Sequence, residues 1–285
     1  MKYLRFLSLI SPKLHTKILF LFIFKRWLFL SKNKVKTLNE KIQWLKFNEY
    51  HKNIYTKCAD KYLVREYVAE KGCSEILNPL IGVYKSYEDI EFDKLPEKFA
   101  LKCNHGAGFN VIVDDKHKID KEVIKSKLDK WMKTDFSLVS AEPHYKKIPR
   151  KIICEEFLVN ECGQFPDDYK FYCFDGVPKY VMLCQGRKDN ETKFYYFDMD
   201  WNLAPLSNDS LEAINQKIKI ERPSGFDDMK KYAYKLASGF KFVRTDFYLV
   251  NGRVIFGELT FTPSAGLDRD RLVSTDIELG SLLKL

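Results

Sequence analysis

The sequence lacks the patterns that mark metal-binding and disulfide-bonded proteins. Its seven cysteines include no C-x-x-C pair, and its five histidines do not stand at metal-ligand spacing, which argues against a zinc site. Several cysteines lie in apolar runs, where a thiol behaves as a small hydrophobic group. We therefore expect reduced cysteines and a cytoplasmic protein. The cysteines are Cys58, Cys73, Cys103, Cys154, Cys162, Cys173 and Cys184.

The sequence also lacks an apolar run long enough to cross a membrane. The longest candidate, residues 17–24, is followed at once by Lys25 and Arg26, whereas a membrane-spanning helix needs roughly 20 apolar residues. No small-residue cleavage site follows it. The pattern indicates a basic amphipathic helix, and two interpretations stay open for residues 1–35. One is peripheral contact with an anionic membrane at its inner face, and the other is packing on the protein's own core.

The net charge of the chain limits the classes of partner that it could bind, but it does not identify one of them. The formal net charge of +9 favours an anionic partner. The basic residues are spread along the chain and no DNA- or RNA-binding signature is present, so we expect no nucleic acid partner. No Ser-His-Asp or Cys-His pattern is present either, which argues against a mechanism with a protein nucleophile.

The order of predicted elements indicates an α+β fold. Residues 37–70 have helical spacing and open with a capping box at Thr37 and Glu40, and residues 120–132 form another amphipathic pattern. From residue 151 onward strand patterns dominate, with a helix predicted at 229–237. The predicted strands are residues 151–158, 169–174, 179–184, 194–197, 240–250 and 253–259, the last pair joined by the Asn-Gly turn 251–252.

The final predicted hairpin gathers charged residues on one face. Alternation places Arg244, Asp246 and Tyr248 on one face of its first strand, and Phe256, Glu258 and Thr260 on one face of its second. If the two faces coincide, two carboxylates and a hydroxyl converge in a manner that suits a hard cation carrying phosphate oxygens. The alternative is a solvated face with a surface salt bridge.

Two other segments carry charge next to apolar strands. Lys102 lies inside an apolar strand and precedes a glycine-containing loop, whose backbone N–H groups could approach a phosphate. Glu155 and Glu156 end the apolar strand 151–158, where a carboxylate could accept hydrogen bonds from ribose hydroxyls. The alternatives are an ordinary turn and a strand end facing water.

Five blocks, in this order, resemble the ATP-grasp superfamily and most closely its TupA-like branch, named for teichuronopeptide biosynthesis. The resemblance covers roughly residues 36–283 and implies an ATP-grasp fold, with a nucleotide held between two α+β subdomains. We expect a catalytic domain at residues 36–285 with a hinge near 155–166. The blocks are 38–45 (LNEKIQWL), 60–68 (DKYLVREYV), 101–108 (LKCNHGAG), 168–176 (DYKFYCFDG) and 257–266 (GELTFTPSAG).

The resemblance also implies roles for individual residues. Arg244 would stabilise the acyl-phosphate and its transition state, and Lys170 would join it as a catalytic and phosphate-binding base. Many ATP-grasp enzymes have Asn where this chain has Thr260. The implied ATP-binding residues are Lys102, a mobile lid with His105, Gly106 and Gly108, the hinge residues Glu155 and Glu156, and Lys170; the implied Mg²⁺ ligands are Asp246, Glu258 and Thr260.

The implied activity is that of an ATP- and Mg²⁺-dependent carboxylate–amine ligase in bacterial surface polysaccharide biosynthesis (capsule, O-antigen or teichuronopeptide). Its partners would be an acidic small molecule or glycan and an amine. Two alternatives stay open. A glycosyltransferase would use Asp198 and Asp200 as a metal-binding D-x-D, and a non-catalytic protein would bind nucleotide without turnover.

Overall fold

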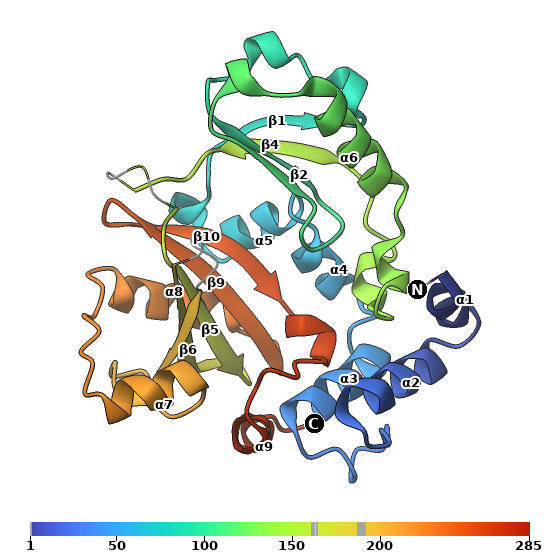
Figure 1. Ribbon diagram of the computed structural model, residues 1–285, viewed down its shortest axis with the longest axis vertical. Helices are drawn as coiled ribbons and strands as arrows, with labels where there is room; N and C mark the ends of the chain where they lie inside the picture. The colour runs from blue at the N-terminus through green and yellow to red at the C-terminus, as the bar shows by residue number, and fades with distance from the viewer. Residues whose placement is uncertain (1, 161–162, 164, 187–191) are drawn as a thin grey trace.

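The strands form two antiparallel sheets, one above the other in Figure 1. The structure is a computed structural model that describes residues 2–160, 163, 165–186 and 192–285. The four-stranded sheet has the order β1 (Leu80–Tyr84), β4 (Ile152–Glu156), β2 (Phe99–Cys103), β3 (Asn110–Val113). The six-stranded sheet has the order β10 (Arg253–Thr260), β9 (Phe242–Val250), β5 (Asp168–Phe174), β6 (Val177–Gln185), β7 (Lys193–Phe197), β8 (Leu203–Ala204).

Helices surround both sheets. Before the first strand lie α1 (Lys2–Ile10), α2 (Pro12–Phe24), α3 (Leu38–Asn48), α4 (Asn53–Ala59) and α5 (Val64–Glu70). Helix α6 (Lys121–Lys133) belongs to the four-stranded sheet, and α7 (Asn208–Asn215), α8 (Phe226–Ala237) and α9 (Val273–Leu282) accompany the six-stranded one. Short 3-10 segments are η1 (Ser74–Ile76), η2 (Tyr87–Asp89), η3 (Phe92–Lys94), η4 (Lys116–Lys118), η5 (Phe136–Leu138), η6 (Pro143–Tyr145) and η7 (Pro263–Gly266).

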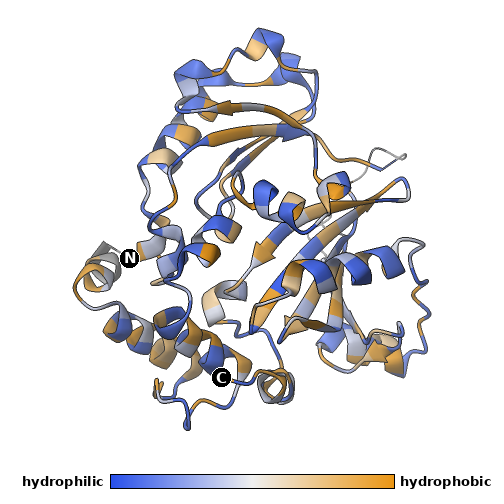
Figure 2. Cartoon of the chain, turned by 180° about the vertical axis from the view of Figure 1, so that it is seen from behind, coloured by the Kyte–Doolittle hydropathy of each residue, from blue (hydrophilic) through white to orange (hydrophobic). Residues whose placement is uncertain are grey.

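Two hydrophobic cores define two lobes. The small lobe, residues 78–156, buries residues of β2 and β4 such as Leu101 and Ile152 against α6. The large lobe, residues 38–77 and 168–285, packs α3 to α5 and α8 with the six-stranded sheet around Phe171 and Phe242. The strands of the small lobe are mostly hydrophobic in Figure 2, and its central strands β2 and β4 are buried along most of their length. The chain therefore passes between lobes near residues 77–80 and again at 156–168.

The second passage falls where we expected a hinge, near 155–166. Residues 161, 162 and 164 of that stretch lie outside the described residues, and hinge motion stays a prediction. No sequence pattern predicted the first passage near 77–80. This passage makes the small lobe an insertion into the large one.

Most predicted elements are present with shifts of a few residues at their ends. The capping box is confirmed: the Thr37 side chain accepts from the Glu40 backbone N–H, and the Glu40 carboxylate accepts from that of Thr37. The hairpin turn at 251–252 also forms as predicted, and a second hairpin turn lies at 175–176. Helices α7 and α9 and the short strand β8 were not predicted.

The N-terminal segment packs partly on the large lobe. His15, Thr16 and Phe20 of α2 are buried, and Arg26 forms an ion pair with Glu40 of α3. Among the described residues, no helix is long and apolar enough to span a bilayer. Six cysteines are buried with free thiols, and Cys162 lies outside the described residues.

Candidate active site

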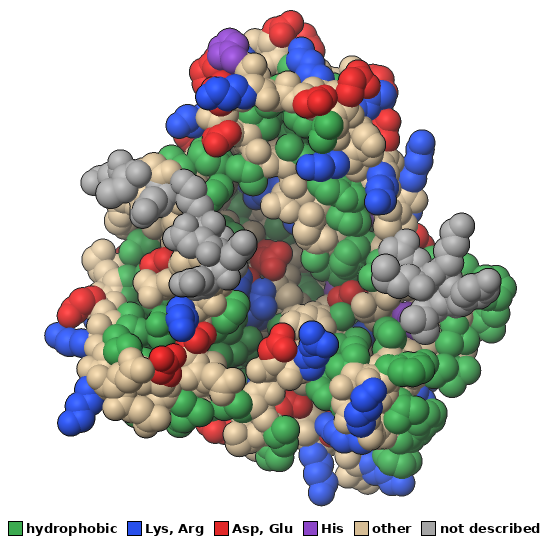
Figure 3. Space-filling view, in the orientation of Figure 1, with side chains coloured by type: hydrophobic (Ala, Val, Ile, Leu, Met, Phe, Trp, Pro, Cys, Tyr) green, Lys and Arg blue, Asp and Glu red, His purple; other side chains and the backbone are tan. Residues whose placement is uncertain are grey.

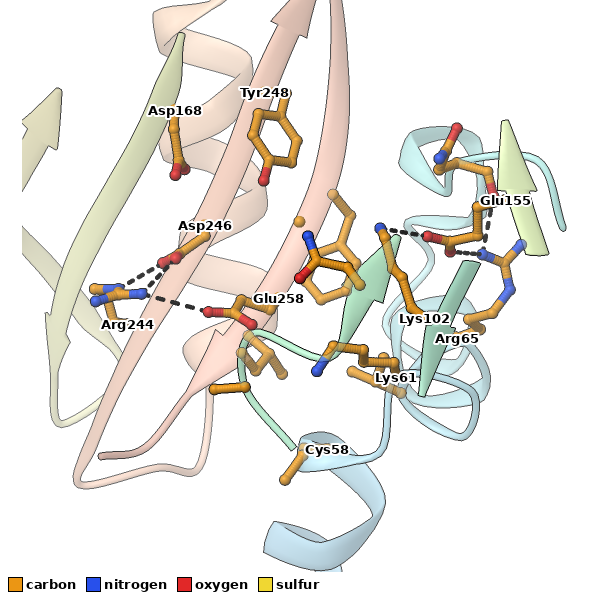
Figure 4. A pocket seen from close by; sticks show the side chains of 18 of the residues that line it. Cys58, Lys61, Arg65, Lys102, Glu155, Asp168, Arg244, Asp246, Tyr248 and Glu258 are labelled. Atoms are coloured by element: carbon orange, nitrogen blue, oxygen red, sulfur yellow. Dashed lines mark hydrogen bonds and ion pairs between the residues drawn. The ribbon is translucent and has the colours of Figure 1, made fainter. Parts of the chain in front are cut away.

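A cavity of about 440 Å³ lies between the two lobes. Figure 3 shows the molecule hollowed at this place, with acidic and basic side chains inside the hollow. Figure 4 shows that side chains from both lobes point into it. The large lobe contributes Lys61, Arg65, Asp168, Lys170, Arg244, Asp246, Tyr248 and Glu258, and the small lobe Asn78, Lys102, Ala107, Gly108, Asn110 and Glu155.

The β9–β10 hairpin brings the predicted metal ligands together. Across the two strands Glu258 pairs with Asp246, and Thr260 pairs with Arg244. The Thr260 hydroxyl donates to Glu258 Oε1 over 2.8 Å. The two expected faces therefore coincide for these four residues. The cluster is buried at Asp246 and partly exposed at Glu258, so it is not the solvated surface salt bridge that we considered as an alternative.

A β-bulge at Gly257 produces this alignment. The strand register shifts between Phe256 and Glu258, so Phe256 pairs with the buried Phe247 and not with a residue of the charged row. Our expectation that Phe256 shares a face with Glu258 was therefore wrong. A Cβ on Gly257 would lie 3.0 Å from the backbone oxygen of Asp246, so glycine permits the close approach of the strands. Bulges of this kind re-aim side chains next to active sites.

Asp246 is the centre of a buried ionic network. It is 2% exposed, and Arg244 holds it in a bidentate pair with nitrogen–oxygen distances of 2.6 and 2.8 Å. Lys170 of β5 pairs with Asp246 across the sheet and donates to the same carboxylate over 2.7 Å. Lys170 also contacts Asp168 at 2.5 Å. Burial opposes the charge on Arg244, but Asp246 raises its pKa above the ordinary range, so the guanidinium stays protonated.

Glu258 faces the cavity from the adjacent strand. Desolvation alone would raise its pKa, but the positive charges of Lys61 and Arg244 lower it to about 2. Glu258 Oε1 lies 3.4 Å from Arg244 Nη2. Glu258 is therefore a carboxylate at neutral pH in surroundings that favour further negative charge, as a phosphate site requires.

The opposite wall carries a second ionic group. Lys102 of β2 donates to Glu155 of β4 over 2.7 Å, and Arg65 lies 3.3 Å from the other oxygen of the same carboxylate. Glu155 is thus the anion that a strand lysine requires. The Lys102 side chain is 27% exposed and reaches the cavity, so it can meet a ligand while keeping this partner.

The glycine-containing loop contributes its second half to the cavity. Ala107, Gly108 and Asn110 line it, and Gly108 has φ +71°, a conformation that favours glycine. His105 is buried, with Nε2 at 3.1 Å from the Trp131 backbone oxygen, and it is not among the lining residues. The position of His105 favours an anchoring role over direct nucleotide contact. The motion of this loop as a lid stays a prediction.

Glu156 lines an adjoining cavity of about 270 Å³. Phe157, Leu158 and Phe165 give this space an apolar lining, and Lys102 and Tyr248 border both cavities. An apolar slot beside the lysine expected to bind phosphate has the chemistry that a planar base requires. Gly106 is not among the residues that line either cavity, and its backbone oxygen accepts from Lys61.

Sequence reasoning missed Lys61 and Arg65 as site residues. Lys61 lines the cavity from the large lobe and donates to the Gly106 oxygen, while its own N–H bonds to the Asn104 oxygen. Burial lowers the Lys61 pKa. Both residues stand in the block 60–68 that resembles the family, and this was a signal that we did not use.

The donor set fits Mg²⁺, although a metal cluster is not evident. In the described part of the chain no group of three or more His, Cys, Asp or Glu side chains has metal-site spacing. Mg²⁺ needs fewer, because it is commonly held by one or two carboxylates together with phosphates and water. Asp246 accepts three hydrogen bonds from Arg244 and Lys170. An ionised carboxylate has about four lone-pair sites, so about one stays available for a cation.

The D-x-D motif has a different place. Asp198 accepts from the backbone N–H groups of Asp200 and Asn202 and from the Asn202 side chain, so its carboxylate stabilises its own turn. Asp200 is exposed. Neither residue lines the cavity between the lobes, so the two acids take no part in that site.

Two lobes that close over a polar cavity, with lysines and paired acids on facing sheets, define a protein of the ATP-grasp class. The family model described as TupA-like ATPgrasp matches residues 40–284. The chain belongs to this family. A search of curated proteins found no match.

Several solved ligase structures are similar to this chain at low identity. D-Alanine–D-alanine ligase from Bacillus anthracis, complexed with ATP, is 16% identical with a TM-score of 0.46 over 79% of this chain and 61% of its own. L-Amino acid ligase from Bacillus licheniformis is 14% identical with a TM-score of 0.47, over 91% and 57%. D-Alanine–D-alanine ligase from Helicobacter pylori is 16% identical with a TM-score of 0.46, over 86% and 69%. The chain thus spans about three fifths of the first two.

Proposed function

We propose that this protein is an ATP- and Mg²⁺-dependent ligase that joins a carboxylate to an amine through an acyl-phosphate. The observation that carries the proposal is the pair of facing ionic groups, Arg244–Asp246–Lys170 on one lobe and Lys102–Glu155 on the other. The acid's carboxylate oxygen bonds to the terminal phosphorus of ATP as ADP leaves. The amine then attacks the acyl carbon and phosphate leaves, which gives an amide.

Each residue has a definite task in this scheme. Lys102 and Lys170 would hold phosphate oxygens, and Asp246 and Glu258 would hold the cation, with Thr260 beside them. Mg²⁺ neutralises charge on the phosphates when bound. Arg244 lies next to both acids and would stabilise the charge that develops during transfer. Phosphoryl transfer asks a protein mainly for positioning and charge neutralisation, so no nucleophilic side chain is needed.

A further cavity of about 470 Å³ supports a place for the acid and the amine. Lys170 and Arg244 line both this cavity and the one between the lobes. Lys170 and Arg244 give this cavity a positively charged end, which would bind the carboxylate of the acid substrate. Acidic groups at Asp209, Asp268 and Asp270 would take an ammonium or hydroxyl groups. This mixture suits a uronic acid or amino acid unit of a surface polysaccharide, the setting that the family suggests.

The test is an ADP-release screen of uronic and amino acids against a set of amines, with purified protein and Mg²⁺. We expect ADP, and not AMP, only when a carboxylic acid is present. Nucleotide binding without ADP release under any pair would support a non-catalytic protein instead. ADP release with an acid that persists in the Asp246→Asn variant would contradict the assigned cation site.

A further inference from the structure

The first 39 residues hold the whole net charge of the chain. They contain nine Lys and Arg residues and no Asp or Glu, so the remaining sequence is balanced at 39 of each kind. The basic residues are spread along the chain, as expected, but the net positive charge is not. This concentration favours an anionic partner at the N-terminal segment specifically.

The same segment exposes large apolar side chains. Phe6, Leu9 and Ile10 of α1 are 63%, 63% and 68% exposed, and Phe22 of α2 is 65% exposed. Phe29, beyond α2, is 53% exposed. Soluble proteins rarely gather apolar side chains in one patch unless it meets a partner. We call these residues, together with Lys13, Lys17, Lys25 and Lys34, the N-terminal patch.

Helix α2 separates a packed face from an open face. Thr16 and Phe20 are buried, whereas Leu14 and Leu21, seven residues apart and therefore on one stripe, are 42% and 38% exposed. On the packed side, Arg26 pairs with Glu40. The core-packing interpretation therefore accounts for one face of the helix and leaves the other without a role.

Basic and aromatic side chains also contact one another in the N-terminal segment. Lys17 lies over the Trp27 ring at 5.8 Å, and Lys34 lies over the Phe29 ring at 4.8 Å. Lysines whose stems cover apolar surface while their charges stay in water are typical of bilayer interfaces. In Figure 3 hydrophobic side chains gather over α1 and α2 at the lower right, with Lys and Arg beside them.

We propose that the N-terminal patch docks on the surface of a bilayer that contains anionic lipid. The apolar side chains would enter the headgroup boundary and the lysines would meet the lipid phosphates, with α1 and α2 lying on the membrane. The patch lies at the edge of the molecule, outside both sheets (Figure 1), so a flat surface can reach it without touching the cavity between the lobes. Helix α1 also contacts η5, which leads toward Tyr145 of that cavity.

The experiment is co-sedimentation of the full chain with vesicles of phosphatidylcholine alone or with one third phosphatidylglycerol. We expect binding to the anionic vesicles only. Because each lysine near the surface contributes about 1 kcal/mol, Lys13→Glu with Lys25→Glu should weaken binding by at least roughly twentyfold. Phe22→Asp with Phe29→Asp should weaken it by at least roughly tenfold. All four positions are exposed, so the variants should fold.

Matched controls lie far along the chain. Lys118→Glu with Lys219→Glu changes side chains that are 82% and 84% exposed, and Val273→Asp changes one that is 76% exposed. These variants should bind vesicles as the parent does. Equal binding by the patch variants and the controls would overturn the proposal. So would parent protein that ignores anionic vesicles and forms a dimer that Phe22→Asp abolishes, because a second copy would then cover the patch.

Discussion

The two walls of the cavity hold their charges in different ways. On the large lobe, Arg244, Asp246 and Lys170 stand on neighbouring strands in the middle of a six-stranded sheet, and their side chains are nearly buried. On the small lobe, Lys102 stands on a strand next to a glycine-containing loop and is partly exposed. The comparison suggests a rigid wall that orients the reacting groups and a more open wall that admits the nucleotide.

The largest effect should come from the rigid wall. Arg244→Ala should lower kcat by roughly 10²- to 10³-fold, the usual loss when one charge-stabilising donor is removed from a transition state. Steady-state ADP release measures this. Arg253→Ala, an exposed arginine at the start of β10, is the control and should keep full activity. If the Arg244→Ala protein had a normal kcat and a raised KM, Arg244 would have a role in substrate binding and not in catalysis.

A change at the bulge should damage the same wall without touching a charge. Gly257→Val puts side-chain atoms against the Asp246 backbone, so the strands must separate and Glu258 moves. We expect a loss of about 1–3 kcal/mol in unfolding free energy, as for other overpacked sites, together with lower activity. Urea denaturation and ADP release measure the two. Unchanged values in both would mean that the bulge is dispensable.

A change in the open wall should weaken the binding of ATP. Lys102→Met keeps the apolar stem and removes the charge, so the Kd for ATP should rise by roughly tenfold or more while the protein stays folded. Isothermal titration calorimetry measures the Kd. Lys98→Met, just before the same strand and exposed, is the matched control. Equal ATP affinity in both variants would remove Lys102 from the phosphate site.

The smallest effect concerns pH. Burial lowers the pKa of His144 to about 3, so the native state keeps this ring neutral when the unfolded chain takes up a proton near pH 6.5. Stability is then full above pH 6.5 and falls with acid, by about 1 kcal/mol between pH 6.5 and 5.5. His144→Phe should flatten this part of the stability curve. His144 packs beside Tyr145, a residue of the cavity wall, and a curve that keeps its slope would place the acid sensitivity elsewhere.

The sequence predicted the two walls unequally for physical reasons. Strand alternation and the Asn-Gly turn act locally, so they were enough to predict the hairpin and to place Arg244 and Asp246 on one face, whereas Glu258 joins them only because of the bulge. The bulge at Gly257 depends on how close two strands approach, which a strand pattern does not encode. The Lys102–Glu155 pair joins residues 53 positions apart, and it required knowledge of which strands are neighbours.

The same limit applies to Lys61 and to the first passage between the lobes. Both depend on an inserted small lobe that meets residues 60–65 of the large one. Helix α9 was missed because its apolar residues serve a contact with α3, far away in sequence. Local signals therefore gave the elements, and long-range contacts decided which residues share the cavity.

The central claim is that the protein activates a carboxylate as an acyl-phosphate. Hydroxylamine captures such an intermediate without the natural amine, so parent protein given its acid, ATP and Mg²⁺ should yield a hydroxamate together with ADP. Arg244→Ala should lower the hydroxamate yield in parallel with ADP release. ADP formation that depends on the acid and Mg²⁺ but gives no hydroxamate at saturating hydroxylamine would contradict the account.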